Sequence, residues 1–430
     1  MKALVMKMIQ NRAKAILAKF KPKVIAITGS IGKTSTKEAI ALVLKDEMSV
    51  RVAKKNYNNE FGVPLTILGE VSPGKSIMGW LGVLFRSYSI KSFPDVLILE
   101  FGADHPGDIE ALCELAPPSV GVITGLSNIH AEFFESSEAL AEEKSQLAMC
   151  LPSDGIVVLN ADDHRVSQMS RETKALVRTF GIKSDDISMS ELRISTRRDE
   201  EFDPGELFAI TSLDVMKSNS KVGELKLRNC LGYAPAMACL AAITVADALG
   251  VSIDFAITEL NREFQPSPGR LNPIAGIKGS LIIDDSYNAA PAAMINGLDI
   301  LKIFSPGEEQ DRRIAALGSM AELGQYSDQE HRQIGFRVAE VADVFIAVGE
   351  NMRIAVESAK EAGMHSDSIE WFATSEEAGR YLDRFVQQGD IVYTKGSQSS
   401  RMEKVVKELM AEPLRAEELL VRQGENWQKS

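Results

Sequence analysis

The 430-residue sequence has few cysteines, no long apolar run and no excess of basic charge. Its cysteines show neither metal-site nor redox-pair spacing, so we expect reduced, buried thiols in a cytoplasmic protein; they are Cys113, Cys150, Cys230 and Cys239. No apolar stretch reaches the roughly 20 residues that cross a bilayer. The net charge of −12 argues against nucleic acid as the main partner. The negative net charge does not argue against phosphorylated substrates, because a few local cations suffice to bind them.

The N-terminal segment 1–22 departs from this acidic balance, because it contains Lys and Arg but no Asp or Glu. Its apolar residues recur at helical spacing, which predicts a basic amphipathic helix. No cleavage-site pattern follows, so the segment does not resemble a signal peptide. We expect a surface helix packed on the first domain. Weak contact with an anionic membrane surface is the alternative.

The most informative stretch is residues 24–36. The apolar run Val24–Ile27 predicts a buried strand, and a Gly-x-x-Gly-Lys-Thr loop and a helical pattern follow it. Loop amides and a helix N-terminus present donors to phosphate, Lys33 adds a positive charge, and the Thr34 hydroxyl can bind Mg²⁺. We therefore predict a phosphate-binding loop with nucleotide contacts from Gly29, Ser30, Gly32, Lys33, Thr34 and Ser35.

The remaining chain alternates strand and helix patterns, which is typical of an α/β fold with a mostly parallel sheet. Expected strands are 24–27, 96–99, 120–124 and 156–159, and expected helices include 36–44, 77–85 and 137–149. Polar residues 183–230 suit antiparallel strands at the side of the first domain. After the linker at 266–270 the pattern restarts as a smaller doubly wound domain. The predicted organisation is an N-terminal helix 1–22, a central ATP-binding domain 23–272, a C-terminal domain 273–412 and a helical tail 413–430.

Nine motifs, taken in their order along the chain, indicate a protein family. They are TGSIGKTSTKE (28–38), NNEFGVPLT (58–66), LEFGADHPGDI (99–109), NIHAEFFESSEALAEEKSQL (128–147), NADD (160–163), PSPGRLNPI (266–274), DDSYNAAPAAM (284–294), LGSMAELG (317–324) and KGSQSSRMEKVV (395–406). The sequence resembles the Mur ligases, the ATP-dependent amide-forming enzymes of peptidoglycan synthesis. Within that family it is most similar to the MurF type, which adds D-Ala-D-Ala to a UDP-MurNAc-tripeptide.

The resemblance implies a P-loop ATPase domain, a Rossmann-like C-terminal domain and a two-step ligation. A substrate carboxylate attacks the γ-phosphate of ATP, and an amine then displaces phosphate from the acyl phosphate. The implied substrates are a nucleotide-sugar peptide and a dipeptide, and the implied enzyme is a cytoplasmic monomer. The resemblance assigns two Mg²⁺ ions to Thr34, Glu100, His130 and Lys144, with Lys144 as a carbamate, and catalytic roles to Lys33, Glu100, His130 and Lys144.

Further residues take expected roles from the same resemblance. Nucleotide contacts are expected from Asn160, Asp163, Arg270 and Asp285. Substrate contacts are expected from Asn58, Asn59, His105, Tyr287, Asn288, Glu322 and Lys395, with His331 as a weaker candidate. A purely structural role is the open alternative for Glu322, His331 and the turn Lys395-Gly396-Ser397.

The sequence departs from the family pattern in three places. About twenty residues precede the phosphate loop, whereas full-length MurF-type enzymes have an N-terminal domain that holds the uridine nucleotide. Tyr233-Ala234 stands where relatives often carry His and then Asn or Gln near adenine, and Gln398 replaces a common Arg. Two alternatives therefore stay open. One is a Mur-fold ligase for a different carboxylate, and the other is a non-catalytic nucleotide-binding partner subunit.

Overall fold

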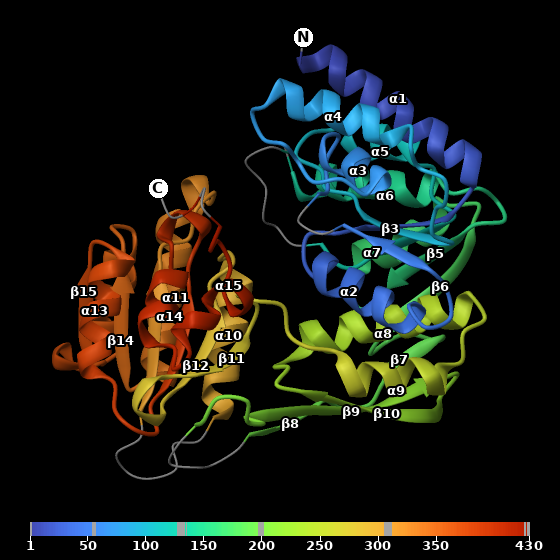
Figure 1. Cartoon of the computed structure of the whole chain (residues 1–430). Coiled ribbons are helices and arrows are strands. Elements are labelled where there is room, and N and C mark those ends of the chain that lie inside the picture. The colour runs from blue at the N-terminus through green and yellow to red at the C-terminus, as the bar shows by residue number, and fades with distance from the viewer. Residues whose placement is uncertain are drawn as a thin grey trace. The chain divides into compact units, whose positions relative to one another are not determined.

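The computed structural model describes residues 2–53, 57–126, 134, 136–196, 202–304, 312–424 and 427. The chain divides into two compact units, drawn with their elements in Figure 1. Unit 1 comprises residues 1–192, 213–226 and 233–264, and unit 2 comprises residues 193–212, 227–232 and 265–430. Both are α/β structures with mostly parallel sheets, so the predicted fold class is confirmed.

The larger sheet has ten strands among the described residues, in the order β10-β9-β7-β6-β5-β4-β1-β3-β2, with β8 beside β9. From β2 to β7 neighbouring strands are parallel, whereas β9 is antiparallel to β7 and β8. The bounds are β1 Lys23–Thr28, β2 Val50–Val52, β3 Val96–Glu100, β4 Val120–Ile123, β5 Ile156–Asn160, β6 Leu176–Gly181, β7 Ile187–Met189, β8 Arg193–Thr196, β9 Ala209–Lys217 and β10 Ser220–Arg228.

Strand β1 lies between β3 and β4, and all three are continuous apolar runs buried along nearly their whole length. Such runs are typical of parallel strands covered on both faces. The chain leaves β1 for the phosphate loop, leaves β3 after Glu100 and leaves β4 before Thr124. Because parallel strands end at the same edge, these three exits lie at the position where open α/β sheets bind ligands.

The helices of unit 1 cover both faces of its sheet. Apolar residues of α1, α3, α4, α5 and α6 share one core, while α2, α8 and α9 contact one another. Buried Ile9, Ala13 and Ile16 attach α1 to that core, as expected of a packed surface helix. The bounds are α1 Lys2–Phe20, α2 Lys33–Leu44, α3 Gly62–Leu68, α4 Ile77–Ser87, α5 Asp108–Leu115, α6 Ser137–Met149, α7 His164–Gln168, α8 Tyr233–Ala248 and α9 Ile253–Glu263.

Unit 2 contains a six-stranded sheet in the order β11-β12-β16-β13-β14-β15. Within this six-stranded sheet, the described strands pair in parallel except for β11 with β12, which are antiparallel. The strands are β11 Asn272–Ala275, β12 Leu281–Asp285, β13 Arg313–Gly318, β14 Val344–Val348, β15 Ile369–Phe372 and β16 Ile391–Lys395. The helices are α10 Pro291–Ile303, α11 Ser327–Val341, α12 Met352–Glu361, α13 Ser375–Phe385, α14 Glu403–Leu409 and α15 Ala416–Leu419.

The helical tail predicted over 413–430 is helical in its first part and irregular at 420–424. Only a 3₁₀ turn, Pro413–Arg415, and the four-residue α15 are helical before the chain leaves helical geometry. The physical reason is tertiary, because Arg422 is buried in an ion pair with Glu403 and donates to backbone carbonyls after β12. These long-range contacts outweigh local helix propensity. None of the described helices has the length and apolar content that a bilayer-spanning helix requires.

Candidate active site

The loop between β1 and α2 has a backbone that only glycine allows at two positions. Gly29 has φ 138° and Gly32 has φ 86°. A Cβ on Gly29 would lie 2.1 Å from the Thr124 hydroxyl oxygen, so a side chain cannot fit there. That hydroxyl donates to the carbonyl of Ile31 at 2.6 Å, which ties the loop to the end of β4. The amides at the start of α2 follow directly, as a phosphate site requires.

Thr34, Lys37 and Glu100 converge beside this loop at the carboxyl end of β3. The Thr34 hydroxyl donates to Oε2 of Glu100 at 3.4 Å, and the Lys37 ammonium lies 3.0 Å from Oε1. The side chains of Lys37 and Glu100 are only 5% and 2% exposed. Lys33 donates from Nζ to the Gly29 carbonyl at 2.6 Å, so its charge lies against the loop. The structure thus brings the predicted residues Lys33, Thr34 and Glu100 together.

Lys37 is a residue of this site that the sequence reasoning missed. It lies one helical turn after Lys33 on α2, within the TGSIGKTSTKE motif. A lysine near the start of a helix is normally solvent-exposed. Its partner, Glu100, is distant in the sequence, so no local spacing could have indicated the ion pair. The order of strands β1 and β3 places the two side chains together.

The residues around Glu100 fit a hydrated Mg²⁺ ion. No described group of three His, Cys, Asp or Glu side chains could hold a metal. Mg²⁺ needs no such cage, because it keeps several waters and takes one or two carboxylates plus phosphate oxygens. Oε1 of Glu100 is buried and accepts no hydrogen bond of good geometry from the described residues, although it forms the ion pair with Lys37. Thr34 and Glu100 therefore supply hard oxygen donors beside the loop. The predicted metal ligand His130 lies outside the described residues.

Lys144 is buried on α6, with 3% of its surface exposed. The Ser136 side chain caps the start of this helix. The neighbouring Glu143 carboxylate accepts from the amides of Gly107 and Ile109, both at 2.7 Å, which attaches α6 to the start of α5. Burial lowers the pKa of Lys144 to about 7, with help from the charge of Lys33, while Glu143, Asp104 and Asp108 act in the opposite direction. A substantial fraction of the amine is therefore neutral near pH 7.

Asn160 and Asp163 support the backbone that follows β4. Nδ2 of Asn160 donates to the Thr124 carbonyl at 2.6 Å. One carboxylate oxygen of Asp163 accepts from the Leu126 amide at 2.7 Å, and the other accepts from the Arg165 amide at the start of α7. The NADD motif thus connects the exit of β5 to the exit of β4. In this structure both side chains position the backbone that follows β4, at Thr124 and Leu126.

The three predicted substrate residues of unit 1 also make local contacts. The Asn58 carbonyl accepts from the Gly102 amide at 2.7 Å, just after β3, so Asn58 lies close to the end of the strand that carries Glu100. Oδ1 of Asn59 accepts from the Phe61 amide at 3.2 Å and from the Gly62 amide at 3.0 Å, in the turn that leads into α3. The His105 amide donates to Asp108 at 2.8 Å. Asn58 and His105 thus occupy the segment around the Glu100 strand end.

In unit 2, Asp285 and Lys395 form a buried pair at the ends of β12 and β16. Lys395 Nζ lies 2.6 Å from Oδ2 of Asp285, and the Tyr393 hydroxyl donates to the same oxygen at 3.2 Å. The adjacent Asp284 accepts from the amides of Gly269 and Ser286 at 3.1 and 3.0 Å. Burial raises the pKa of Asp284 to about 6. Asp284 and Asp285 therefore hold the turn at Gly269 and the start of the loop after β12.

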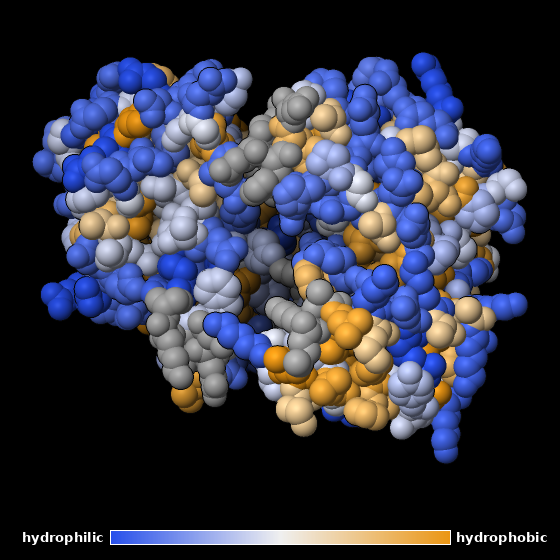
Figure 2. Space-filling model, turned by 90° about the horizontal axis from the view of Figure 1, so that it is seen from above, coloured by the Kyte–Doolittle hydropathy of each residue, from blue (hydrophilic) through white to orange (hydrophobic). Residues whose placement is uncertain are grey.

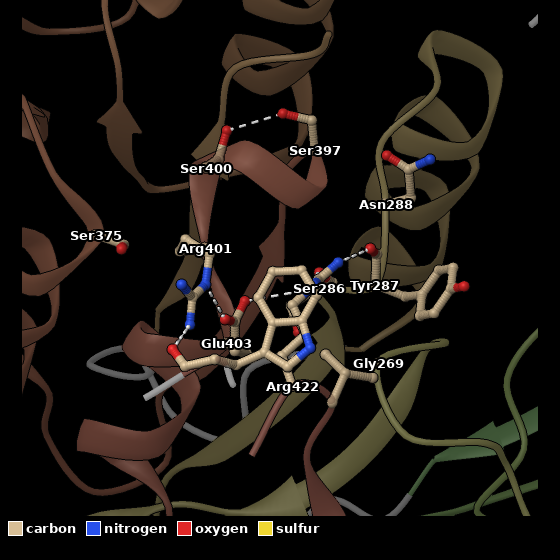
Figure 3. A network of polar contacts seen from close by, with 12 residues as sticks. Gly269, Ser286, Tyr287, Asn288, Ser375, Ser397, Ser400, Arg401, Glu403 and Arg422 are labelled. Carbon is tan, nitrogen blue, oxygen red and sulfur yellow. Dashed lines mark hydrogen bonds and ion pairs between the residues drawn. The ribbon is translucent and has the colours of Figure 1, made fainter. Parts of the chain in front are cut away.

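Figure 3 shows how the C-terminal tail holds this loop. Arg422 pairs with Glu403 at 3.0 Å, donates to the Ser286 carbonyl at 3.1 Å, and also donates to the Tyr287 carbonyl. The Arg270 guanidinium lies over the Tyr287 ring, 4.2 Å from its centroid. The side chain of Asn288 lies apart from this network (Figure 3). The tail was not among the sequence-predicted site residues, because an Arg in a polar segment carries no signal of burial.

The remaining candidates of unit 2 surround the segment after β13. His331 is fully buried, with Nδ1 donating to the Ser327 carbonyl at 2.7 Å and Nε2 accepting from the Met320 amide at 3.1 Å. Burial lowers the His331 pKa, so the ring is held neutral in one tautomer. Glu322 has a left-handed backbone, with φ 63°. His331 therefore positions the segment that carries Glu322.

Comparisons with known proteins agree with this arrangement. Residues 27–246 match the Mur ligase middle domain, and residues 269–398 match the Mur ligase glutamate ligase domain. The UDP-N-acetylmuramoyl-tripeptide--D-alanyl-D-alanine ligase of Mycobacterium tuberculosis is 30% identical over 407 residues, covering 90% of this chain and 73% of that enzyme. The Escherichia coli enzyme of the same name is 28% identical over 398 residues, covering 90% and 76%.

Solved structures give the same result. The MurF ligase of Thermotoga maritima in complex with ADP has a TM-score of 0.74 and 26% identity, covering 94% of this chain and 83% of that chain. A MurF structure from Acinetobacter baumannii has a TM-score of 0.73 and 26% identity, covering 94% and 79%. Sequence identity, matched domains and fold therefore agree along nearly the whole chain. The chain belongs to the Mur ligase family.

Proposed function

We propose that this chain works as a cytoplasmic monomer and joins D-alanyl-D-alanine to a UDP-N-acetylmuramoyl-tripeptide, as the names of its relatives describe. It is an ATP-dependent, amide-forming ligase of peptidoglycan precursor synthesis. The observation that carries the choice of residues is the convergence of Thr34, Lys37 and Glu100 beside the phosphate loop.

The proposed reaction has two steps. A carboxylate oxygen of the tripeptide forms a bond to the γ-phosphorus of ATP, the bond to the β-phosphate oxygen breaks, and ADP leaves. The amine of the dipeptide then attacks the acyl carbon, phosphate leaves, and the amine loses a proton. Negative charge accumulates on the transferred phosphoryl group, so loop amides and Lys33 stabilise the first transition state. Lys37 keeps the Glu100 carboxylate facing the loop.

For Mg²⁺, we propose Thr34 and Glu100 as ligands, with His130 and Lys144 assigned to a second ion. Bound Mg²⁺ supplies positive charge that offsets the charge of the phosphates. The support for the first position is the hard oxygen of Thr34 beside a buried, incompletely hydrogen-bonded Glu100 carboxylate. The assignment of His130 depends on the motif alone.

We further propose that Lys144 is carbamylated. The neutral amine attacks the carbon of CO₂, a nitrogen–carbon bond forms and one proton is released, which leaves an anionic carbamate. Two features support this step, namely the burial of Lys144 and its pKa of about 7. Carbamylation also removes the cost of burying an ammonium group near Lys33.

For unit 2 we propose nucleotide contacts from Arg270 and Asp285 and substrate contacts from Tyr287, Asn288, Glu322 and Lys395. The stacking of Arg270 on Tyr287 supports a shared role for that pair. Asp285 and Lys395 also pair with each other at 2.6 Å, and this pair holds the start of the loop after β12. Asn58, Asn59 and His105 are proposed for the acceptor, and Asn160 and Asp163 for positioning the loop edge.

The test is phosphate release by the purified chain with ATP and Mg²⁺. We expect release that requires both UDP-N-acetylmuramoyl-tripeptide and D-alanyl-D-alanine, with ligated pentapeptide detected by mass spectrometry. The Lys33→Ala variant is the control for contaminating ATPase. Release with a different carboxylate and amine, and none with this pair, would assign the chain to another ligase reaction. Nucleotide binding without turnover of any pair would indicate a non-catalytic subunit.

A further inference from the structure

The outer surface of α1 and α4 differs in charge from the rest of the chain. Residues 1–23 and 71–94 contain ten Lys and Arg and no Asp or Glu, in a chain with 60 acidic residues. The two segments meet in unit 1, because Arg12 donates to the Ser87 carbonyl at 3.0 Å and lies 4.3 Å from the Tyr88 ring centroid. One face of an acidic protein therefore carries basic charge. We call the outward residues of α1 and of the segment 71–94, which contains α4, the basic apolar face.

Large apolar side chains are exposed on this face. Met78 is 77% exposed and Phe85 is 72% exposed, and their spacing of two helical turns places both on the outer side of α4. The opposite side of α4 carries buried Trp80 and Val83, so the helix packs normally and still presents an apolar outer side. Figure 2, which views the molecule from above, shows apolar surface gathered in one area and bordered by hydrophilic residues.

Helix α1 repeats this pattern beside α4. Leu4 is 65% and Met8 is 44% exposed, one turn apart on the outer side of the helix. Lys7 and Lys14 are exposed on one border of this stripe, and Lys19 is exposed on the other. An apolar stripe with lysines on both borders is the arrangement by which a helix lies in the interface of an anionic bilayer.

We propose that the basic apolar face docks on a bilayer that contains anionic phospholipid. Charge complementarity selects this occupant, because the face repels a second copy of itself and attracts an anionic surface. Nucleic acid is also anionic, but it offers no apolar layer for Met78 and Phe85. Arg86 is paired with Glu70, so Lys7, Lys14, Lys19, Lys75 and Lys91 provide the attraction.

The experiment is co-sedimentation of the full chain with vesicles of phosphatidylcholine, alone or mixed with phosphatidylglycerol, at low and high salt. We expect binding only to the mixed vesicles, and weaker binding at high salt. The Met78→Asp/Phe85→Asp variant should bind roughly tenfold more weakly, because an apolar contribution is lost and negative charge is added. Lys7→Ala and Lys14→Ala should each weaken binding about fivefold.

A matched control removes exposed apolar residues elsewhere. Leu176→Asp and Leu414→Asp, which are 51% and 99% exposed, should leave vesicle binding unchanged. The melting temperature of each variant identifies any that fail to fold, and the lysine variants then still test the surface. Absence of binding to the mixed vesicles overturns the proposal. Vesicle binding that Met78→Asp/Phe85→Asp leaves at the native strength also overturns the proposal. Self-association or nucleic-acid binding in the absence of vesicle binding would overturn it as well. These outcomes do not depend on which substrates the enzyme ligates.

Discussion

The candidate residues of the two units differ in how their charges are compensated. In unit 2, both oxygens of Asp285 have partners, since Oδ1 accepts from the Leu271 amide and Oδ2 contacts Lys395 and Tyr393. In unit 1, Oε1 of Glu100 is buried with an ion pair but without a hydrogen bond of good geometry among the described residues. Lys144 is buried near a second cation, Lys33, and its pKa is strongly lowered.

This difference distinguishes residues that stabilise the fold from residues that take part in the reaction. Fully compensated buried groups stabilise one conformation, and removing either partner is costly. Lys144 is held in unfavourable electrostatic surroundings, and groups with such perturbed pKa values cluster at functional sites. We therefore expect substitutions in the unit 2 network to lower the stability of that unit. Substitutions around the phosphate loop should lower activity with little effect on stability.

The largest expected effect is on the stability of unit 2. Arg422→Ala removes one of the two arginines paired with the buried Glu403 carboxylate, which keeps Arg401 at 2.6 Å, and leaves two backbone carbonyls without this donor, so we expect unfolding to become easier by about 3 kcal/mol. Trp371 and Trp427 lie in unit 2 and Trp80 lies in unit 1. Urea unfolding followed by tryptophan fluorescence in a Trp80→Phe background therefore reports on unit 2.

Two variants sharpen this measurement. Arg422→Lys keeps a positive charge near Glu403 but loses the fork of donors, so its midpoint should lie between the native and Arg422→Ala values. Arg415→Ala removes an exposed arginine of the same tail, paired with Glu412 and Glu418, and should leave the midpoint unchanged. Equal midpoints for Arg422→Ala and the native chain would show that the buried tail contacts do not stabilise unit 2.

The next effect is on catalysis in unit 1. Lys33→Ala removes the charge that lies against the phosphate loop, and we expect kcat/KM to fall about 10²–10³-fold. The melting temperature should change little, because the loop conformation depends on glycines and on Thr34 and Thr124. Lys45→Ala, at the other end of α2, is the matched control and should retain activity. A large loss of stability in Lys33→Ala would contradict the division between the units.

The strand pattern of the fold was largely predictable from the sequence, because buried parallel strands are continuous apolar runs. Strands β1, β3, β4 and β5 match the expected ranges closely. Strand β6 was missed because its residues are mostly half-exposed and include Arg178. Strand β2 has only three residues, which is too short for a periodic signal.

The site was predictable where one local motif carries the chemistry and unpredictable where pairing crosses elements. The phosphate loop and Glu100 follow from short segments with glycine or a strand end. Lys37 could not be assigned, because its role depends on Glu100 lying on the neighbouring strand. Arg422 was missed for the same reason, since its partners lie in the loop after β12 and on α14.

A smaller effect is expected for Lys144→Ala, about 10²-fold in kcat, because the proposed metal-binding carbamate is lost while the phosphate loop is intact. Short carboxylates such as formate or acetate should restore part of the activity by supplying the missing oxygens. The same additives should not restore Lys33→Ala. In the native chain, ¹³C-labelled bicarbonate should give a carbamate signal by NMR that is absent from Lys144→Ala. An active protein indifferent to the Lys144 substitution would exclude the carbamate.

The smallest expected effect is the pH dependence of the carbamate. Because the Lys144 pKa is lowered from 10.5 to about 7, the neutral amine that reacts with CO₂ is scarce below pH 7 and predominates above it. At a fixed CO₂ pressure, the neutral fraction rises about tenfold between pH 6 and pH 8. The initial rate at which the ¹³C carbamate signal forms should follow it. Asp104 raises the Lys144 pKa, so Asp104→Asn should shift this profile to lower pH, whereas Asp95→Asn, which is not among the charges acting on Lys144, should not. A rate that does not change from pH 6 to pH 8 would mean that the Lys144 pKa does not lie near 7. The electrostatic contrast between the two units would then depend on Glu100 alone.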